Sequence, residues 1–152
     1  MRLADILRPD CVIADLSGGT IASVLAELAR PAAVVAGVDA AVLSAALAAR
    51  EKLGTTGVGD GVAVPHCKAA GLPALTAVLG RSREGVDFRA HDGKPTRIFV
   101  ALLAPERAGA EHLQALARVS RILKRPEFRK ALLEAADAAA MHQLVVDEDA
   151  RP

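Results

Sequence analysis

The fold is decided by the stretch Arg50-Glu-Lys-Leu-Gly-Thr-Thr-Gly-Val-Gly-Asp-Gly-Val-Ala-Val-Pro-His-Cys-Lys68, where a helix gives way to a glycine-rich loop and then to a strand. We predict the helix over 39–53, with Asp39 as its N-cap and Gly54 as its C-terminal stop. The apolar residues expected on one face of this helix are Val42, Leu43, Ala46, Leu47 and Leu53. The apolar run Val62–Pro65 is typical of a strand.

Outward from this stretch, helices flank a central block of strands. Thr20 can cap a helix with an apolar stripe, and Pro31 either interrupts this helix or begins a following turn of helix, which leaves its end open. Further helices are predicted at 3–7, at 110–123 and from Pro126 to about 136, and further strands at 75–79, 85–88 and 97–103, while 139–146 fits either structure. The fold class is therefore α/β: a single domain over 1–146, with a mixed parallel/antiparallel central sheet flanked by helices on both sides, and a short solvated tail at 147–152.

Length and composition restrict the function classes. The 152 residues favour one domain, and 19 basic against 18 acidic residues give a net charge of +1. With no Trp or Tyr and three Phe, the chain lacks the basic surface and aromatic platforms that nucleic-acid binding needs. Stretches without charge fall well below the ~18 residues of a spanning helix, so we expect no membrane insertion. An N-terminus without a signal-peptide core and two cysteines without a disulfide framework indicate a cytoplasmic protein.

Three chemistries fit the motifs poorly. The loop 55–61 runs from helix to strand with no Lys-Ser/Thr after it, whereas a phosphate-binding P-loop runs from strand to helix, so its glycines are better explained by a tight turn. No metal is expected, because the available side chains lack the spacing of a ligand set; they are His66, Cys67, His91 and His112. A thiol enzyme ranks last, because Cys67 adjoins His66 and successive strand side chains point to opposite faces.

Three residues remain as candidates for a functional site. His66 follows an apolar strand beside the flexible glycine loop, although many such histidines are ordinary surface residues. Arg50 lies where the buried stripe of its helix meets the helix end, a position equally explained by compensation of the C-terminal dipole. His112 shares a face with apolar residues of its helix, which also suits a core histidine. The sequence permits these three to converge into a phosphate-sized site; His91 and His142 are expected at the surface.

The stretch 50–68 resembles the signature of the fructose/mannitol/nitrogen-class enzyme IIA proteins of the bacterial phosphoenolpyruvate-dependent phosphotransferase system. In that signature an Arg-Glu pair ends a helix, a glycine-rich segment follows, and an Ala-apolar-Pro-His strand carries the phosphorylated histidine. Later blocks of the family match in the same order, namely Glu84-Gly-Val-Asp-Phe88, Asp92-Gly-Lys-Pro-Thr96, Phe99-Val-Ala-Leu-Leu-Ala-Pro105 and His112-Leu-Gln-Ala-Leu-Ala117. The resemblance covers essentially the whole chain and implies the type-2 IIA fold.

By this resemblance, His66 is the phosphoryl acceptor, and Arg50 and His112 surround it. The chemistry suits these roles, because a loose in-line transition state needs positioning and charge stabilisation, which a planar guanidinium and a second imidazole supply. Backbone amides of the glycine loop, at Gly59 and Gly61, are expected to help bind the phosphoryl group. The resemblance implies no metal and no cofactor.

The resemblance also implies the partners. We expect an HPr-like phosphocarrier protein as donor and, because no membrane or IIB-like sequence is fused, a nitrogen-class regulatory protein that acts on target proteins. The alternatives are a sugar-transport IIA that passes phosphate to the cysteine of a IIB domain, and a binding module that has lost phosphorylation. Two departures from the family bear on the site: Cys67 adds an oxidisable thiol, and the charge of Asp60 is expected to slow phosphoryl transfer.

Overall fold

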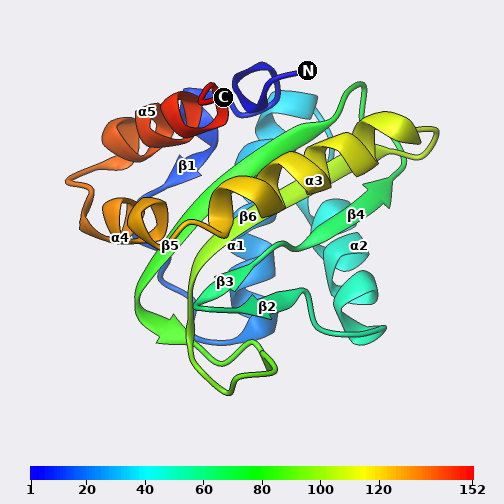
Figure 1. Ribbon diagram of the computed structural model, residues 1–152. Coiled ribbons are helices and arrows are strands. Elements are labelled where there is room, and N and C mark those ends of the chain that lie inside the picture. The colour runs from blue at the N-terminus through cyan, green and yellow to red at the C-terminus, as the bar shows by residue number, and fades with distance from the viewer.

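The longest strand pairings are made by β6 (Thr96–Pro105), which lies at the centre of the sheet in the computed structural model of residues 1–152 (Figure 1). It pairs antiparallel with β5 along one edge and parallel with β3 and then β4 along the other. The sheet order is β1-β5-β6-β3-β2, with β4 also on β6. The other strands are β1 (Val12–Ile13), β2 (Gly57–Gly59), β3 (Val62–Ala63), β4 (His66–Ala69) and β5 (Thr76–Val86).

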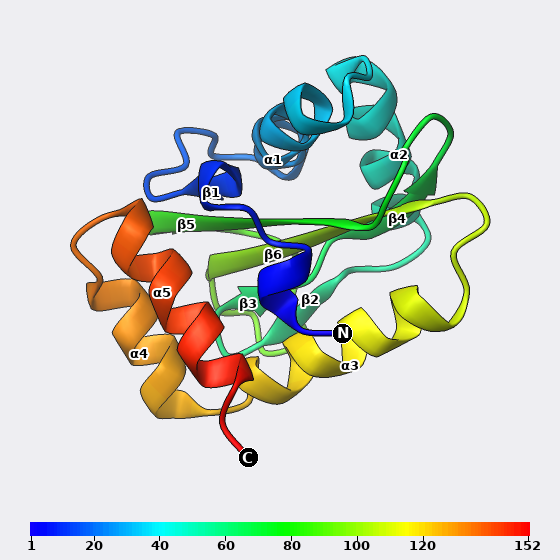
Figure 2. The same cartoon turned by 90° about the horizontal axis from the view of Figure 1, so that it is seen from above.

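Helices cover both faces of this sheet, which confirms the predicted fold class. Figure 2 shows α1 and α2 on one side and α3, α4 and α5 on the other. Their bounds are α1 (Ile21–Ala36), α2 (Ala40–Lys52), α3 (Ala110–Leu123), α4 (Pro126–Glu134) and α5 (Ala138–Asp149), and two short 3₁₀ helices span Leu3–Asp5 and Pro9–Cys11. None of the helices combines the length and the hydropathy that crossing a membrane requires.

The core lies between the sheet and its two helical layers. Residues Ala101–Ala104 of β6 are all fully buried, because a central strand with helices on both faces exposes neither face to water. Phe88 and Phe99 meet edge to face with ring centroids 5.1 Å apart. Because both faces of β6 are buried, its sequence is a continuous apolar run rather than an alternating pattern, and this run made β6 recognisable as a strand.

The helix caps follow the sequence signals. The Thr20 hydroxyl accepts a hydrogen bond from the backbone N–H of Ser23, and the carboxylate of Asp39 accepts one from Ala41. Pro31 does not end α1, which continues to Ala36 and stops at Gly37 in the left-handed conformation.

The predicted apolar face of α2 is wrong at two positions. Leu43 and Leu47 are fully buried, but the side chain of Val42 is 49% exposed and that of Leu53 is 85% exposed. Leu53 is the C-cap residue, beyond the last turn, so it no longer follows the helical periodicity. The buried stripe of α2 is accordingly narrower than its sequence indicated.

The predicted strand Val62–Pro65 is only half correct. β3 ends at Ala63, and a new strand begins at His66 further along the same edge of β6. Val64 and Pro65 lie between them, and Pro65 has no N–H to give to the sheet. Its carbonyl still accepts a hydrogen bond from Leu102, which keeps the chain on β6 and places His66 at the start of β4.

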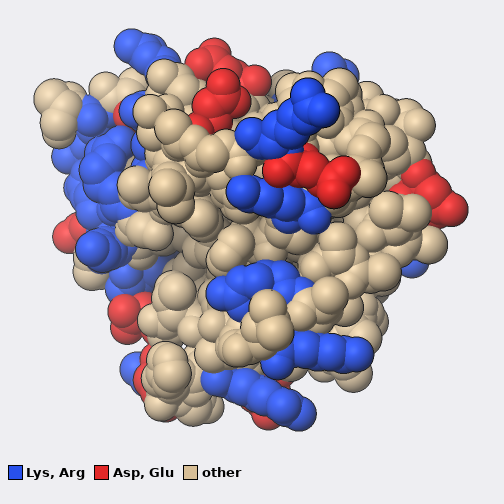
Figure 3. All heavy atoms as spheres, turned by 90° about the vertical axis from the view of Figure 1, so that its right-hand side faces the viewer, with Lys and Arg blue, Asp and Glu red and all other residues tan.

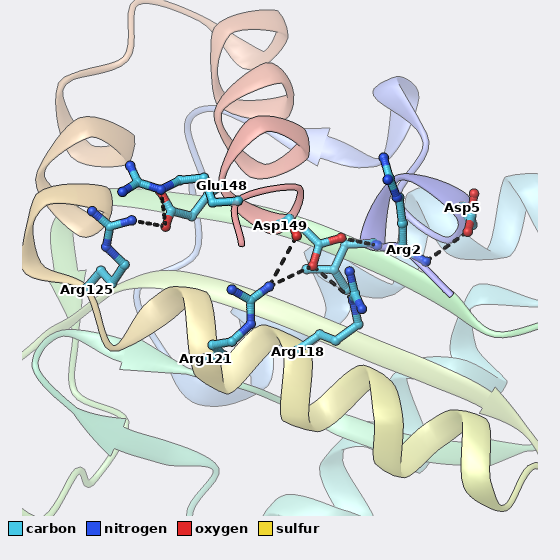
Figure 4. Close-up of polar contacts among 9 residues, drawn as sticks. Arg2, Asp5, Arg118, Arg121, Arg125, Glu148 and Asp149 are labelled. Atoms are coloured by element: carbon cyan, nitrogen blue, oxygen red, sulfur yellow. Dashed lines mark hydrogen bonds and ion pairs between the residues drawn. The ribbon is translucent and has the colours of Figure 1, made fainter.

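The solvated tail predicted at 147–152 is wrong for its first half, because α5 continues to Asp149. The side chains of Glu148 and Asp149 are buried. They are held by arginines of α3 and by the loop that follows it, as Figure 4 shows. The Asp149 carboxylate also accepts a hydrogen bond of 2.7 Å from the backbone N–H of Leu3, so the two ends of the chain are tied together.

Candidate functional site

Two histidines from distant parts of the chain meet where β4 begins its pairing with β6. His66 opens β4 opposite Leu102, and His112 lies in the first turn of α3. Their ring centroids are 5.7 Å apart, and the rings are inclined at 75°. His66 is half-buried, whereas His112 is buried. The structure therefore brings together two of the three residues that the sequence singled out.

The hydrogen bonding of His66 assigns its tautomer. The Nδ1 atom lies 2.9 Å from the carbonyl oxygen of Val64. A carbonyl oxygen can only accept, so Nδ1 carries the proton. In a neutral ring the lone pair then belongs to Nε2, which makes Nε2 the nucleophilic atom. Val64 is the residue at which β3 breaks off, so the interruption of the strand also supplies this acceptor.

The environment of His112 favours its neutral form. Burial lowers the pKa of His112 below its usual value, and the nearby His66 and Lys68 lower it further. Its Nε2 atom is buried without a hydrogen-bond partner in the protein. A buried imidazole nitrogen without a partner is costly, and His112 is the only histidine in this position. It is thus available to interact with a group placed between the two rings.

Arg50 lies in the last turn of α2, and its guanidinium donates a hydrogen bond of 2.9 Å from Nη1 to the carbonyl of Gly54. This contact agrees with the alternative explanation of Arg50 given above, in which the arginine compensates the C-terminal end of its helix. The structure records no hydrogen bond from Arg50 to either histidine. α2 packs against β4, so Arg50 lies on an element next to the one that carries His66, with its remaining N–H groups uncommitted.

Gly59 and Gly61 do not belong to the histidine site. Asp60 and Gly61 both have positive φ angles and form the two-residue turn of the β2–β3 hairpin, a geometry that Asp-Gly favours. Val62 lies opposite Ile98 and His66 opposite Leu102, so the two are four residue steps apart along β6, which corresponds to about 13 Å. The expected phosphate-binding amides are therefore misplaced, and so is the expected effect of the Asp60 charge on transfer.

Glu51 is a site residue that sequence reasoning missed. Its carboxylate accepts hydrogen bonds from the backbone N–H of Thr56 at 2.8 Å and from the Thr56 hydroxyl at 2.5 Å. The carbonyl of Thr56 in turn accepts a hydrogen bond from the backbone N–H of Val64. Glu51 thus fixes the loop that carries the partner of His66. The Arg-Glu pair at the helix end was the available signal, but only its arginine was considered.

The remaining candidates do not join the site. Cys67 is buried, and burial raises the pKa of its thiol to about 11, which opposes formation of a thiolate nucleophile. His91 is exposed, while His142 is half-buried with its Nε2 atom 2.9 Å from the carbonyl oxygen of Leu7. No group of three or more His, Cys, Asp or Glu side chains is arranged to hold a metal ion.

The surface beside the histidines is basic and partly apolar. Figure 3 views the molecule from the side on which α2 and the end of β4 lie, and more of this surface is blue than red. Lys68 is exposed on β4, two residues beyond His66. The side chain of Leu113, next to His112, is 69% exposed.

The fold and the paired histidines define the class of protein to which the chain belongs. Residues 5–148 match the family described as phosphoenolpyruvate-dependent sugar phosphotransferase system, EIIA 2, and the chain belongs to this family. The resemblance found in the sequence is confirmed.

Within the family, the similarity extends over the whole chain to nitrogen regulatory proteins. The nitrogen regulatory protein of Bradyrhizobium diazoefficiens is 38% identical over 145 residues, which cover 95% of either chain. The crystal structure of the nitrogen regulatory protein IIA-Ntr from Neisseria meningitidis superimposes with a TM-score of 0.88 at 32% identity, covering 94% of this chain and 98% of that one. The fructose-specific EIIABC component of Bacillus subtilis is 40% identical over 100 residues, which cover 66% of this chain and 16% of that protein.

Proposed function

We propose that this protein is a histidine phosphocarrier of the nitrogen-regulatory class, which accepts a phosphoryl group on Nε2 of His66 from a phosphorylated HPr-like protein. The observation that carries the proposal is the pairing of His66 with His112, with Nδ1 of His66 bonded to the carbonyl of Val64. This bond directs the lone pair to Nε2 and holds the ring in one orientation.

The transfer exchanges one phosphorus–nitrogen bond for another. The bond between phosphorus and the donor's imidazole breaks as the lone pair of His66 Nε2 forms a new bond to phosphorus on the opposite side. Attack by a neutral ring leaves a positive charge on the phosphorylated imidazole, and the carbonyl of Val64 stabilises the Nδ1–H that shares this charge. The same bond is in place before and after transfer, so the acceptor needs little reorganisation.

The groups around His66 stabilise the charge on the moving phosphoryl group. A neutral His112 with its proton on Nε2 can donate a hydrogen bond to a phosphoryl oxygen, which would satisfy its unpartnered nitrogen. Arg50 keeps its bond to Gly54 through one nitrogen and has further N–H groups for the phosphoryl oxygens. To bind the phosphoryl oxygens at His66, the guanidinium of Arg50 has to extend beyond the end of α2.

The regulatory class is supported by the full-length similarity to a nitrogen regulatory protein. A second candidate, a sugar-transport IIA that passes the phosphoryl group to a IIB cysteine, is supported by the similarity to a fructose-specific component over two thirds of the chain. In either case the basic surface and Leu113 beside the histidines would contact the partner protein.

The test is intact-mass measurement after incubation with phosphoenolpyruvate, enzyme I and an HPr-like carrier from the same cell. The wild-type protein should gain one acid-labile phosphoryl group, and His66→Ala should gain none. His91→Ala is the matched control, because it removes an exposed histidine from a turn and should be labelled like the wild type. His112→Ala should be labelled about a hundredfold more slowly, the usual effect of losing one donor to a transition state.

Three outcomes separate the alternatives. A failure of the wild-type protein to gain mass with carriers shown to be active would leave a binding module as the explanation. Transfer from the labelled protein to the cysteine of a IIB domain would favour sugar transport over regulation. Loss of labelling in Cys67→Ser with retention in His66→Ala would establish a thiol enzyme and contradict the proposal.

A further inference from the structure

A second concave site lies at the opposite end of the β3–β6 pairing from the histidines. It is a hollow of about 350 Å³ where the β2–β3 turn, the start of β6 and α4 meet. These elements lie toward the lower left of Figure 1. We call this site the β3–β6–α4 hollow; Gly61 and Ile98 belong to its lining. The register of β3 and β4 on β6 separates it from His66 by about 13 Å or more, so it is not part of the histidine site.

The charges in this hollow are not balanced. Lys94, Arg97 and Arg129 line it, and Asp60 is the only acidic residue that does so. Asp92 lies beside the hollow, because its carboxylate accepts hydrogen bonds from the backbone N–H groups of Asp60 and Lys94, so three cations meet two carboxylates and leave one net positive charge. None of the three cations forms an ion pair with any carboxylate of the protein, although eight ion pairs occur elsewhere on the molecule.

The two guanidinium groups are held in position by backbone carbonyls. Arg129 donates a hydrogen bond of 2.8 Å from Nη1 to the carbonyl of Leu123, and Arg97 donates one from Nη1 to the carbonyl of Arg83. Each bond uses one nitrogen and leaves further N–H groups of the same planar group free. Because carbonyls rather than carboxylates hold them, their positive charge is not neutralised. A ligand would therefore meet cations that are already ordered, which reduces the entropy cost of binding.

From this arrangement we infer that the β3–β6–α4 hollow binds a small anion that carries phosphate or carboxylate groups. The net positive charge favours an anion, and guanidinium groups bind phosphate and carboxylate through two N–H groups at once. Four of the eight lining residues are charged, so the lining favours a charged ligand over an uncharged aromatic or lipid molecule. A volume of about 350 Å³ lies in the range of small-molecule sites, and a concave site suits a small ligand better than an acidic protein segment.

The experiment is titration of the ¹⁵N-labelled protein with pyrophosphate, followed by amide chemical shifts. Saturable shifts are expected at the amides of Gly61, Arg97 and Arg129, with an affinity that falls as salt rises. Lys94→Gln is the most informative variant, because the Lys94 side chain makes no hydrogen bond or ion pair in the native protein and its loss costs no contact. It should weaken binding about fivefold, the effect of removing one exposed charge beside an anion.

Arg30→Gln is the matched control. Arg30 is an exposed arginine on α1, on the other face of the sheet, and it also forms no ion pair. This variant should bind pyrophosphate as the wild type does. Equal weakening of pyrophosphate binding in Arg30→Gln and Lys94→Gln would show that the anion is attracted by the overall charge of the protein, and would overturn the inference.

Three further results would also overturn it. These are the absence of saturable shifts at millimolar pyrophosphate, shifts centred on His66 and His112, and tight binding of hexaglutamate in place of pyrophosphate. The last result would assign the hollow to an acidic protein partner. Because the titration needs no phosphoryl donor, its outcome does not depend on the function proposed for His66.

Discussion

The buried carboxylate of Asp149 should contribute more to stability than any other charge in α5, and replacing Asp149 with Asn tests this. Its side chain is 2% exposed and accepts hydrogen bonds on both oxygens: Oδ2 from the backbone N–H of Leu3 at 2.7 Å, and Oδ1 from Arg118 Nε at 3.0 Å (Figure 4). Arg121 contacts the same Oδ1 at 3.4 Å. The residue therefore ties α5 both to α3 and to the N-terminus.

The cost of Asp149→Asn can be estimated from these contacts. An asparagine keeps one acceptor oxygen, so it can satisfy either Leu3 or Arg118, and its NH₂ group then faces an N–H donor on the other side. Losing one hydrogen bond to a charged group costs about 1.5–3 kcal/mol, and the mismatched donors add to this. The arginine partners are one third to one half exposed, which limits the loss of Coulomb energy. We therefore expect a destabilisation of about 3 kcal/mol, which lowers the Tm of a domain of this size by roughly 9 °C.

The assay is urea denaturation followed by circular dichroism, with Asp147→Asn as the control. Asp147 lies in the same helix and undergoes the same change of charge, but it is exposed and contacts only Gln143. Its replacement should change the free energy of unfolding by no more than about 0.5 kcal/mol. In a double-mutant cycle, Arg118→Gln should cost less in the Asp149→Asn background than in the wild type. The reasoning would be refuted if Asp149→Asn and Asp147→Asn were equally mild.

Three further predictions concern the site and the core. The pKa of His112, measured by NMR, should lie below that of a free histidine and should rise in Lys68→Gln. Because the folded state resists protonation of His112, the protein should become less stable as pH falls below about 6.5. A His112 pKa above that value would contradict the burial argument. Gly80→Ala should lower the free energy of unfolding, measured by urea denaturation, by about 1–3 kcal/mol, because the added Cβ would lie 2.9 Å from side-chain carbons of two buried leucines. Gly19→Ala is the control: its added Cβ meets nothing within 4 Å, so its effect should be mild. Cys67, whose thiol pKa is raised to about 11, should react with iodoacetamide at pH 8 far more slowly in the native than in the unfolded protein; equal rates would show that it is not buried.

Local chemistry allowed much of the fold to be predicted from the sequence. The caps at Thr20 and Asp39 were correct because each depends on a side chain that bonds within its own first helical turn. The helix from 110 to 123 was correct because its apolar residues repeat at the helical period. Signals of this kind do not depend on the rest of the chain.

The errors arose where distant residues decide the outcome. Glu148 and Asp149 are charged and near the end of the sequence, so they were expected in water, but arginines more than twenty residues away in the chain allow their burial. The Gly61 error has a different cause. Gly61 is only five residues from His66, but extended chain carries those residues far apart along β6.

The candidate site itself was predictable in its residue types but not in its geometry. His66 and His112 could be selected from their positions at element ends, but their approach to 5.7 Å depends on β4 pairing with β6 and on α3 crossing that edge. The acceptor of the Nδ1 proton was not foreseeable, because it results from the break between β3 and β4 at Val64. Glu51 was missed because it stabilises the loop rather than contacting the histidines.

The bond between Leu3 and Asp149 has a consequence for the synthesis of the protein. The 3₁₀ helix Leu3–Asp5 packs on α5, which is synthesised after the other four α-helices of this fold. At typical rates of translation the first residues wait about ten seconds for that partner. During this time the apolar side chains of Leu3 and Leu7, which are buried in the finished fold, have no α5 to cover them. Chaperones that bind short apolar segments would therefore find these residues of the nascent chain exposed until α5 has been synthesised.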